Sequence, residues 1–348
     1  MREVAAEVGV SVATASNAYN RPDQLSEELR VRILEAAKRL GYSGPDPLGR
    51  SLRTRRAGAI GVLYTDRLSY AFTDPAAVMF LEGVSLAAEE AELRLFLVPS
   101  GPRSGRETDV VLSAAVDGFV VYCVSADDPL IGAAIERGLP MILVDDPSRE
   151  SVASIGIDDE GGARAAAEHL VELGHRRFGV VSFKLTLEPD RGLADLARQE
   201  SASNEDTRSR LRGYKTAVEG VGVPWKDVPL YECPKNTPEE GKAAAKALLA
   251  RDPRPSAILA LSDQLAFGVI EAAKELGLSI PEDLSVVGFD DVSEAARSTP
   301  PLTTVYQPHV EKGLKAGRKL VALLEGEDPG EPEVLPTRLV IRGSTASP

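Results

Sequence analysis

Short apolar runs alternate with helical patterns through most of this 348-residue chain. Runs with the length and composition of buried strands lie at 59–64, 93–98, 117–122, 140–145, 178–183, 257–261 and 284–289. Helical patterns lie between most of them, at 76–91, 161–173, 208–219, 239–250 and 264–276. Such alternation is typical of parallel sheets covered by helices on both faces. Because roughly 290 residues are too many for one such sheet, we expect two α/β subdomains side by side.

The first forty residues follow a different pattern. Residues 2–19 predict two short helices around a turn at Gly9, with Ser11 capping the second helix. A third helix is expected to begin after Ser26 and to end at Gly41. Three helices in about 40 residues fit a helix-turn-helix domain, although any small three-helix bundle shares this apolar pattern. DNA binding is favoured by short polar side chains on the second helix, at Thr14, Ser16, Asn17 and Asn20.

The charge of the chain is unevenly distributed. The net charge of −13 by itself argues against a nucleic-acid partner. Residues 1–56, however, hold ten Lys/Arg and seven Asp/Glu, against 30 and 46 in the remainder. Four of the ten are clustered at the end of this segment, at Arg50, Arg53, Arg55 and Arg56. The pattern indicates a basic arm on an acidic body, with a solvated charged linker as the alternative.

Several classes of protein are disfavoured by composition. Two cysteines, Cys123 and Cys233, cannot form a disulfide framework, and three scattered histidines give no metal-site spacing. No run of 18 apolar residues is present, and Glu3 and Glu7 lie where a secretory signal would be apolar. We therefore expect a cytoplasmic protein without a metal, a cofactor or a membrane partner.

Polar residues gather where the predicted strands end, which is where open parallel sheets bind ligands. Carboxylates and hydroxyls at such an edge suit a polyhydroxylated or amine-bearing ligand. Each of these residues could equally cap a helix or a turn. They are Thr65, Asp66, Asp145, Asp158, Ser262, Asp263, Asp290 and Asp291.

Residues 4–52, VAAEVGVSVATASNAYNRPDQLSEELRVRILEAAKRLGYSGPDPLGRSL, resemble the N-terminal signature of the lactose-repressor (LacI/GalR) family of transcriptional regulators. The resemblance continues through VDGFVVY, LVDD, GGARAAAEHLVELGHRRFGVV, RLRGY, ALSDQLAFGVIEAAKELGLSIPEDLSVVGFDD, PPLTTVYQP and RLVIRGST, and so covers nearly the whole chain. It implies a helix-turn-helix domain at 1–43, a hinge at 44–56 and an effector-binding and dimerisation domain at 57–348. The last resembles periplasmic sugar-binding proteins, with two subdomains joined by three crossovers. We expect one subdomain at about 57–158 plus 308–326, and the other at about 159–307 plus 327–348.

The resemblance also implies roles in DNA binding. The second helix would be the recognition helix, with Val12, Ala13 and Asn17 reading bases. Leu52 matches the hinge leucine that the family inserts into the minor groove. Phosphate contacts are implied for Ser11, Thr14, Ser16, Asn20, Arg50 and Arg53.

In the body, Arg210 and Asp290 match the two positions that most consistently hold the effector in this family. Asp145, Asp158 and Ser262 match secondary positions, and Asp66, Phe72 and His309 are expected near the ligand. Asn236 stands where many members place an aromatic ring, so a large sugar would be held differently or not at all. Asp263 and Asp291 are expected to cap helices instead of contacting the effector.

Two further departures from the family pattern concern the chain's start and one insertion. Met1 stands where the family still has part of its first helix, so either the start is placed late or DNA binding is weakened. Residues 184–207 are longer than the family's usual loop, which makes them either a lid or a disordered insertion. The chain ends at Pro348 without a heptad tail, which predicts a dimer and not a tetramer.

Together these features predict a transcriptional repressor that binds a pseudo-palindromic operator as a homodimer and responds to a small metabolite, with a sugar as the leading candidate. The alternative is a solute-binding or ligand-sensing protein with weak or lost DNA binding. A transport-associated binding protein would need an export signal, and this chain shows none. An enzyme is disfavoured, because a phosphate-binding glycine loop and a nucleophile elbow are both lacking.

Overall fold

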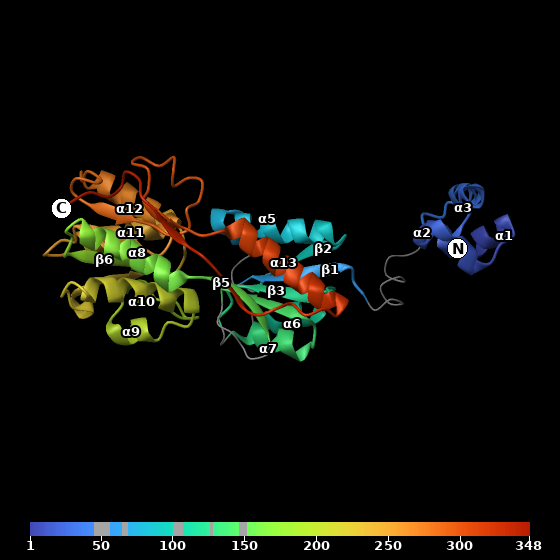
Figure 1. The fold of residues 1–348 in the computed structure, drawn as a ribbon, viewed down its shortest axis with the longest axis horizontal. Helices are drawn as coiled ribbons and strands as arrows, with labels where there is room; N and C mark the ends of the chain where they lie inside the picture. The colour runs from blue at the N-terminus through green and yellow to red at the C-terminus, as the bar shows by residue number, and fades with distance from the viewer. Residues whose placement is uncertain (45–55, 65–68, 100–106, 126–127, 146–151) are drawn as a thin grey trace. The chain divides into compact units, whose positions relative to one another are not determined.

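The computed structural model describes residues 1–44, 56–64, 69–99, 107–125, 128–145 and 152–348. It forms two compact units, Met1–Gly58 and Ala59–Pro348, here called the N-terminal and C-terminal units (Figure 1). Arg50, Leu52, Arg53 and Asp66, which the sequence assigned to DNA or effector contacts, lie outside the described residues.

The N-terminal unit contains the three expected helices, α1 (Arg2–Val8), α2 (Val12–Asn20) and α3 (Glu27–Arg39), with a 3-10 turn at Pro22–Gln24. Gly9 ends α1 in the left-handed conformation, with φ of 74°. The Ser11 hydroxyl accepts the Thr14 N–H at 3.0 Å, and the Ser26 hydroxyl accepts the Leu29 N–H at 3.3 Å, so both predicted caps form. The core consists of Val4, Ala5, Ala15, Ala18, Ile33, Ala36 and Ala37.

The C-terminal unit begins with a six-stranded parallel sheet in the order β12-β5-β4-β3-β1-β2. Alternate residues of its strands pack against α5 and α13 on one face and against α6 and α7 on the other. Both faces are therefore buried, which explains why β1 is apolar without a break. The bounds are β1 Ala59–Tyr64, β2 Arg94–Pro99, β3 Gly118–Tyr122, β4 Met141–Val144, β5 Ala153–Ile157, β12 Glu333–Leu335, α5 Pro75–Glu90, α6 Glu107–Ser113, α7 Pro129–Glu136 and α13 His309–Glu325.

The second sheet has the order β10-β9-β6-β8-β7, and its edge strand β7 is antiparallel to β8. Helices α11 and α12 cover one face, and α8 and α10 cover the other. Its elements are β6 Phe178–Ser182, β7 Gly192–Leu193, β8 Leu230–Glu232, β9 Ala257–Ala260, β10 Ser285–Val287, α8 Asp159–Glu172, α10 Glu205–Glu219, α11 Pro238–Leu249 and α12 Asp263–Glu275. Two 3-10 turns, Tyr70–Phe72 and Trp225–Asp227, complete the unit.

The chain passes three times between the two sheets: from β5 to α8, from β11 (Thr304–Tyr306) to α13, and from β12 to β13 (Arg338–Val340). Strands β11 and β13 pair with each other in antiparallel fashion. The sequence placed all of 327–348 with the second subdomain, and this was wrong for β12. That strand pairs with β5 and completes the edge of the first sheet before the chain returns.

Helices α5 and α13 lie side by side over the first sheet, with their backbones in near contact (Figure 1). A Cβ atom on Gly83 would lie 2.0 Å from the carbonyl oxygen of Val310, and one on Gly313 would lie 2.1 Å from that of Phe80. No side chain fits at either position. This close packing fixes the first turns of α13, which carry residues discussed below.

Residues 184–207, here called the insert segment, are folded and form an edge of the second sheet. They include β7 and a short helix, α9 (Leu196–Glu200), whose Arg198 pairs with Glu232 of β8. The alternative of a disordered insertion was therefore wrong. Among the described residues, no helix is long and apolar enough to cross a membrane.

Candidate functional site

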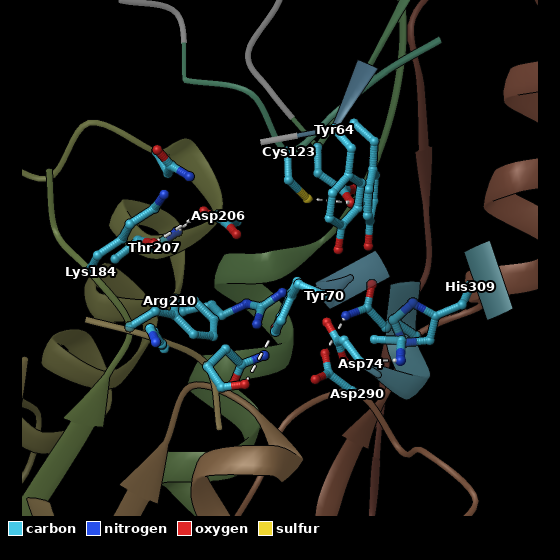
Figure 2. Close-up of a pocket in the computed structure, with 18 of the residues that line it drawn as sticks. Tyr64, Tyr70, Asp74, Cys123, Lys184, Asp206, Thr207, Arg210, Asp290 and His309 are labelled. Atoms are coloured by element: carbon cyan, nitrogen blue, oxygen red, sulfur yellow. Dashed lines mark hydrogen bonds between the residues drawn. The ribbon is translucent and has the colours of Figure 1, made fainter. Parts of the chain in front are cut away.

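A cavity of about 130 Å³ lies where the carboxyl ends of β1, β3 and β4 face the second sheet, inside the C-terminal unit (Figure 2). Both subdomains and the crossing segment before α13 supply its walls. In Figure 2, Lys184, Asp206 and Thr207 lie to one side, and Asp74, Asp290 and His309 to the other. The walls consist of Tyr64, Tyr70, Asp74, Ala76, Tyr122, Cys123, Asp145, Phe183, Lys184, Asn204, Asp206, Thr207, Arg210, Pro234, Lys235, Asn236, Asp290, Gln307 and His309.

Arg210 enters the cavity from α10 and is held on several sides. Its Nε donates to Asp159 at 2.7 Å, and a terminal nitrogen donates to the carbonyl of Leu261 at 2.6 Å. The guanidinium carbon lies 3.8 Å from the centre of the Phe289 ring. Burial opposes the charge of Arg210, but the surrounding Asp159, Asp290 and Asp206 outweigh this and raise its pKa. The guanidinium is thus a fixed cation at the cavity wall.

A series of buried polar groups, joined by hydrogen bonds and an ion pair, leads from Asp290 to the first sheet. The Gln307 amide donates to Asp290 at 2.6 Å, and the Lys312 ammonium donates to the Gln307 oxygen at 2.9 Å. Lys312, only 1% exposed, also pairs with Asp145 at the end of β4. Burial raises the pKa of Asp290 to about 7, despite the attraction of Arg210. These contacts link Asp290, on the cavity wall of the second subdomain, to α13 and to the first subdomain.

One wall of the cavity is aromatic. The rings of Tyr64 and Tyr122, at the ends of β1 and β3, lie 5.7 Å apart between centroids, and Tyr64 and Tyr70 lie 6.4 Å apart. The Tyr70 hydroxyl donates to the backbone carbonyl of Asn236 at 3.4 Å, joining the two subdomains. The cavity therefore has aromatic residues in its wall, although none of them occupies the position of Asn236.

Some buried polar atoms at the cavity have no hydrogen-bond partner among the described residues. They are both ring nitrogens of His309 and one carboxylate oxygen of Asp145. Burial, with the nearby Lys312 and Arg210, keeps the pKa of His309 well below its usual value, so the ring is neutral. Burial also raises the pKa of Asp74 to about 6. Because such groups require partners, the cavity suits a ligand with several hydroxyl or amino groups.

In the N-terminal unit, α2 presents an outward face. Val12 is 46% exposed and Ala13 is also exposed, whereas Ala15 and Ala18 point into the core. The Asn17 amide donates to Gln24 at 3.2 Å, and the Asn20 amide donates to Ser16 at 3.0 Å. The hydroxyls of Ser11 and Thr14 lie 2.8 Å apart. A short, capped helix with exposed small and amide side chains can enter a major groove.

Residues 1–44 match the family of bacterial regulatory proteins, lacI family, and residues 167–345 match a periplasmic binding protein-like domain. The chain is 43% identical to the HTH-type transcriptional regulator IpsA of Corynebacterium glutamicum, over all of this chain and 97% of the relative. The chain belongs to the lacI family of transcriptional regulators.

Two solved structures of the family extend the match to the fold. A LacI-family regulator from Corynebacterium glutamicum has a TM-score of 0.76 and 39% identity, over 99% of this chain and 98% of that one. The regulator CelR in complex with cellobiose has a TM-score of 0.72 and 29% identity, with the same coverage. The predicted architecture of a helix-turn-helix domain followed by a periplasmic-binding-protein-like domain is thereby confirmed.

Five of the residues that the family resemblance assigned to the effector line the cavity, namely Arg210, Asp290, Asp145, Asn236 and His309. Three others do not. Asp158 caps α8 by accepting the Gly161 N–H at 2.9 Å, and Phe72 is 63% exposed outside the cavity. Ser262 caps α12 and reaches the cavity only through its hydrogen bond to Asn236. None of these three side chains forms the cavity wall.

Asp263 and Asp291 lie off the cavity wall, but their expected role as helix caps was wrong. The Asp263 carboxylate accepts from the Thr304 hydroxyl and from the Val292 N–H at 2.9 Å, which holds the loop after β10 against β11. Asp291 pairs with Arg342 at 2.6 Å. Both carboxylates fix the crossing segments, because those segments run beside the end of β10.

Sequence reasoning missed most of the aromatic and crossing residues of the cavity. Tyr64, Tyr122 and Cys123 stand at or just after predicted strands, so the rule for strand ends could have found them had it included aromatic and thiol groups. Asp74 is the N-cap of α5, accepting the Ala76 N–H at 3.2 Å, and carries no strand signal. Asp206 lies in the insert segment, for which no contacts could be predicted.

Proposed function

We propose that this protein is a transcriptional repressor that binds a pseudo-palindromic operator as a homodimer, with a sugar as the effector that changes its operator affinity. The main observation that supports the effector role is the cavity between the two sheets, where fixed charges, unpaired polar atoms and tyrosine rings occur together. The cellobiose complex of CelR supports a sugar as the ligand class. Homodimerisation would supply the paired half-sites that a two-fold operator requires.

The proposed switch is a change in the relative arrangement of the two subdomains. Two hydrogen bonds connect parts of the cavity that belong to different segments. One joins Tyr70 of the first subdomain to Asn236 of the second, and the other joins Gln307, on the segment that crosses to α13, to Asp290. A sugar that engages Arg210 and Asp290 would favour the arrangement in which those bonds form. Since a ligand shifts an equilibrium only through different affinities for its two states, the effector must bind one arrangement more tightly.

The effector assignment is tested by thermal shift and operator binding in parallel. A sugar panel is screened for a rise in melting temperature, which any ligand of the native state must produce. Asp290→Ala and Arg210→Ala are expected to abolish the effect of the stabilising sugar on operator binding while leaving operator affinity intact. Glu90→Gln, which weakens an exposed ion pair with Arg318 on the same unit, is the control. An unchanged response in both cavity variants contradicts the assignment, and conversion of the sugar to a product contradicts a pure sensor.

The DNA assignment is tested at Leu52, which we propose inserts into the minor groove. Leu52→Ala is expected to weaken binding to an operator selected from random sequence, while sparing most of the affinity for unrelated DNA. Fluorescence anisotropy on both DNAs at several salt concentrations measures this. Equal losses on both would show that Leu52 does not contribute to specific recognition.

A further inference from the structure

The insert segment is organised around one buried carboxylate, that of Glu232 at the end of β8. Glu232 is 1% exposed and accepts four hydrogen bonds from the insert. Two come from the backbone N–H groups of Leu185 and Asp190, at 2.9 and 3.1 Å, and two come from the Arg198 guanidinium, at 2.8 and 2.9 Å. Because a buried carboxylate is costly without a cation and donors, Glu232 stabilises only the docked form of the insert.

The docked insert leads directly into the cavity. Lys184 lines the cavity beside Leu185, and Asn204, Asp206 and Thr207 line it at the other end of the segment. The Ser203 N–H donates to the Leu185 carbonyl at 2.7 Å, so the two ends are joined at the residue that Glu232 holds. The carbonyl of Ser203 in turn accepts the Ser125 hydroxyl of the first subdomain at 3.3 Å. One carboxylate therefore holds the backbone beside Lys184 and Asn204, next to the start of α10, which carries Asp206 and Thr207.

The chain carries a natural reporter for this docking. Trp225, its single tryptophan, donates its indole N–H to the side-chain oxygen of Gln199 on α9 at 2.8 Å. The indole is buried against the insert and is only 5% exposed. Release of α9 would break this bond and expose the ring to water, which shifts tryptophan emission to longer wavelength.

We propose that Glu232 and Arg198 are a positioning pair that holds the insert segment as a wall of the effector cavity and thereby determines which effector the cavity accepts. The inference rests on the proposed effector role of that cavity. It assigns specificity to a segment at the edge of the second sheet, held by residues that do not line the cavity. The part of the insert before α10 contributes the Lys184 ammonium and the Asn204 amide, so its release removes a cation and an amide from the cavity wall.

The deciding measurement is hydrogen exchange on the full-length protein. Arg198→Met leaves the carboxylate unpaired, and Glu232→Gln places an amide NH₂ against the guanidinium donors. Both should accelerate exchange at residues 185, 190 and 203 at least tenfold, with β6 and β9 unchanged and Trp225 emission shifted to longer wavelength. Arg198→Lys, which keeps the charge but not the two-pronged geometry, should restore part of the protection. The control is Lys246→Met, which removes an exposed ion pair with Glu275 on the same subdomain.

The functional measurement compares D-ribose, D-glucose and cellobiose by thermal shift. The ranking found for the wild type should hold in Lys246→Met and be lost or reordered in Arg198→Met, while operator affinity without sugar stays within twofold. Unchanged exchange at residues 185, 190 and 203 in both main variants would overturn the positioning role, and faster exchange with an unchanged ranking would overturn the specificity role. If exchange in β6 and β9 also becomes faster in the main variants, the same comparisons of exchange and sugar ranking are made with Arg198→Lys. If no sugar stabilises the wild type, the proposed sugar effector fails, whereas the exchange result still decides the positioning role.

Discussion

In the N-terminal unit, the side chains proposed to contact DNA within the described residues come from Ser11 and the helix that follows it, α2. The cavity of the C-terminal unit, by contrast, draws its walls from segments between Tyr64 and His309. The first surface is exposed and built by local hydrogen bonds, and the second is buried and depends on tertiary packing. Substitutions should therefore affect function without affecting stability in α2, and affect both at the cavity.

The strongest test of this contrast is Lys312→Met. Removing the ammonium leaves Asp145 buried without its cation. Loss of one partner from a buried ion pair lowers the free energy of unfolding by about 3–5 kcal/mol. Urea unfolding followed by Trp225 fluorescence measures the stability of the C-terminal unit. The control on the same helix is Arg318→Met, whose pair with Glu90 is exposed to solvent and should contribute little to stability.

The double variant Lys312→Met with Asp145→Asn sharpens this test. It removes the uncompensated charge and should recover part of the lost stability. Equal costs for Lys312→Met and Arg318→Met would show that the cavity surroundings tolerate change as readily as an exposed surface.

A second test uses the pH dependence of Asp74. Burial raises the folded-state pKa of this carboxyl to about 6 from 3.8, so the native state binds the proton more tightly than the unfolded state. Its contribution is fully present below about pH 4 and is lost as the pH rises through 6. The loss is on the order of 3 kcal/mol, at 1.36 kcal/mol per pKa unit.

Asp74→Asn should therefore match the wild type near pH 4 and exceed its stability near pH 7.5. Urea unfolding at several pH values measures the difference. Asp74→Ala also removes the acceptor for the Ala76 N–H. Its stability should change as little with pH as that of Asp74→Asn, but should be lower than that of Asp74→Asn at every pH. Parallel curves for the wild type and Asp74→Asn would contradict the expectation.

The smallest expected effect is at the exposed surface. Asn17→Ala should lose about 1–3 kcal/mol of discrimination between operator and random DNA, without a change in the thermal unfolding of the protein. Asn20→Ala, at a proposed phosphate contact, should weaken binding to both DNAs about equally. Anisotropy titrations on the two DNAs measure both. If Asn17→Ala behaves like Asn20→Ala, Asn17 does not read bases.

The same contrast explains what could be predicted from the sequence. The capped helices of the N-terminal unit and the apolar strands of both sheets depend on residues close in sequence, and their positions were predicted to within a few residues. Short strands such as β8 and β12 carry too few residues for a clear pattern and were missed. Five of the predicted effector residues line the cavity. The strand-end pattern had already indicated Asp145 and Asp290, whereas Arg210, Asn236 and His309 were found through the family resemblance. Lys312 and Glu232 were missed because buried charged residues have no sequence signature before their partners are known.

The backbone contact between α5 and α13 has a consequence for engineering this protein into a biosensor. Gly83 and Gly313 leave no space for even a methyl group, so the helix pair behind the cavity cannot be repacked to enlarge it. New specificity has to come from the tips of the strands and from the insert segment, where side chains can change length without moving a helix. A mutant library should therefore keep both glycines fixed and vary Lys184, Asn204 and Asn236.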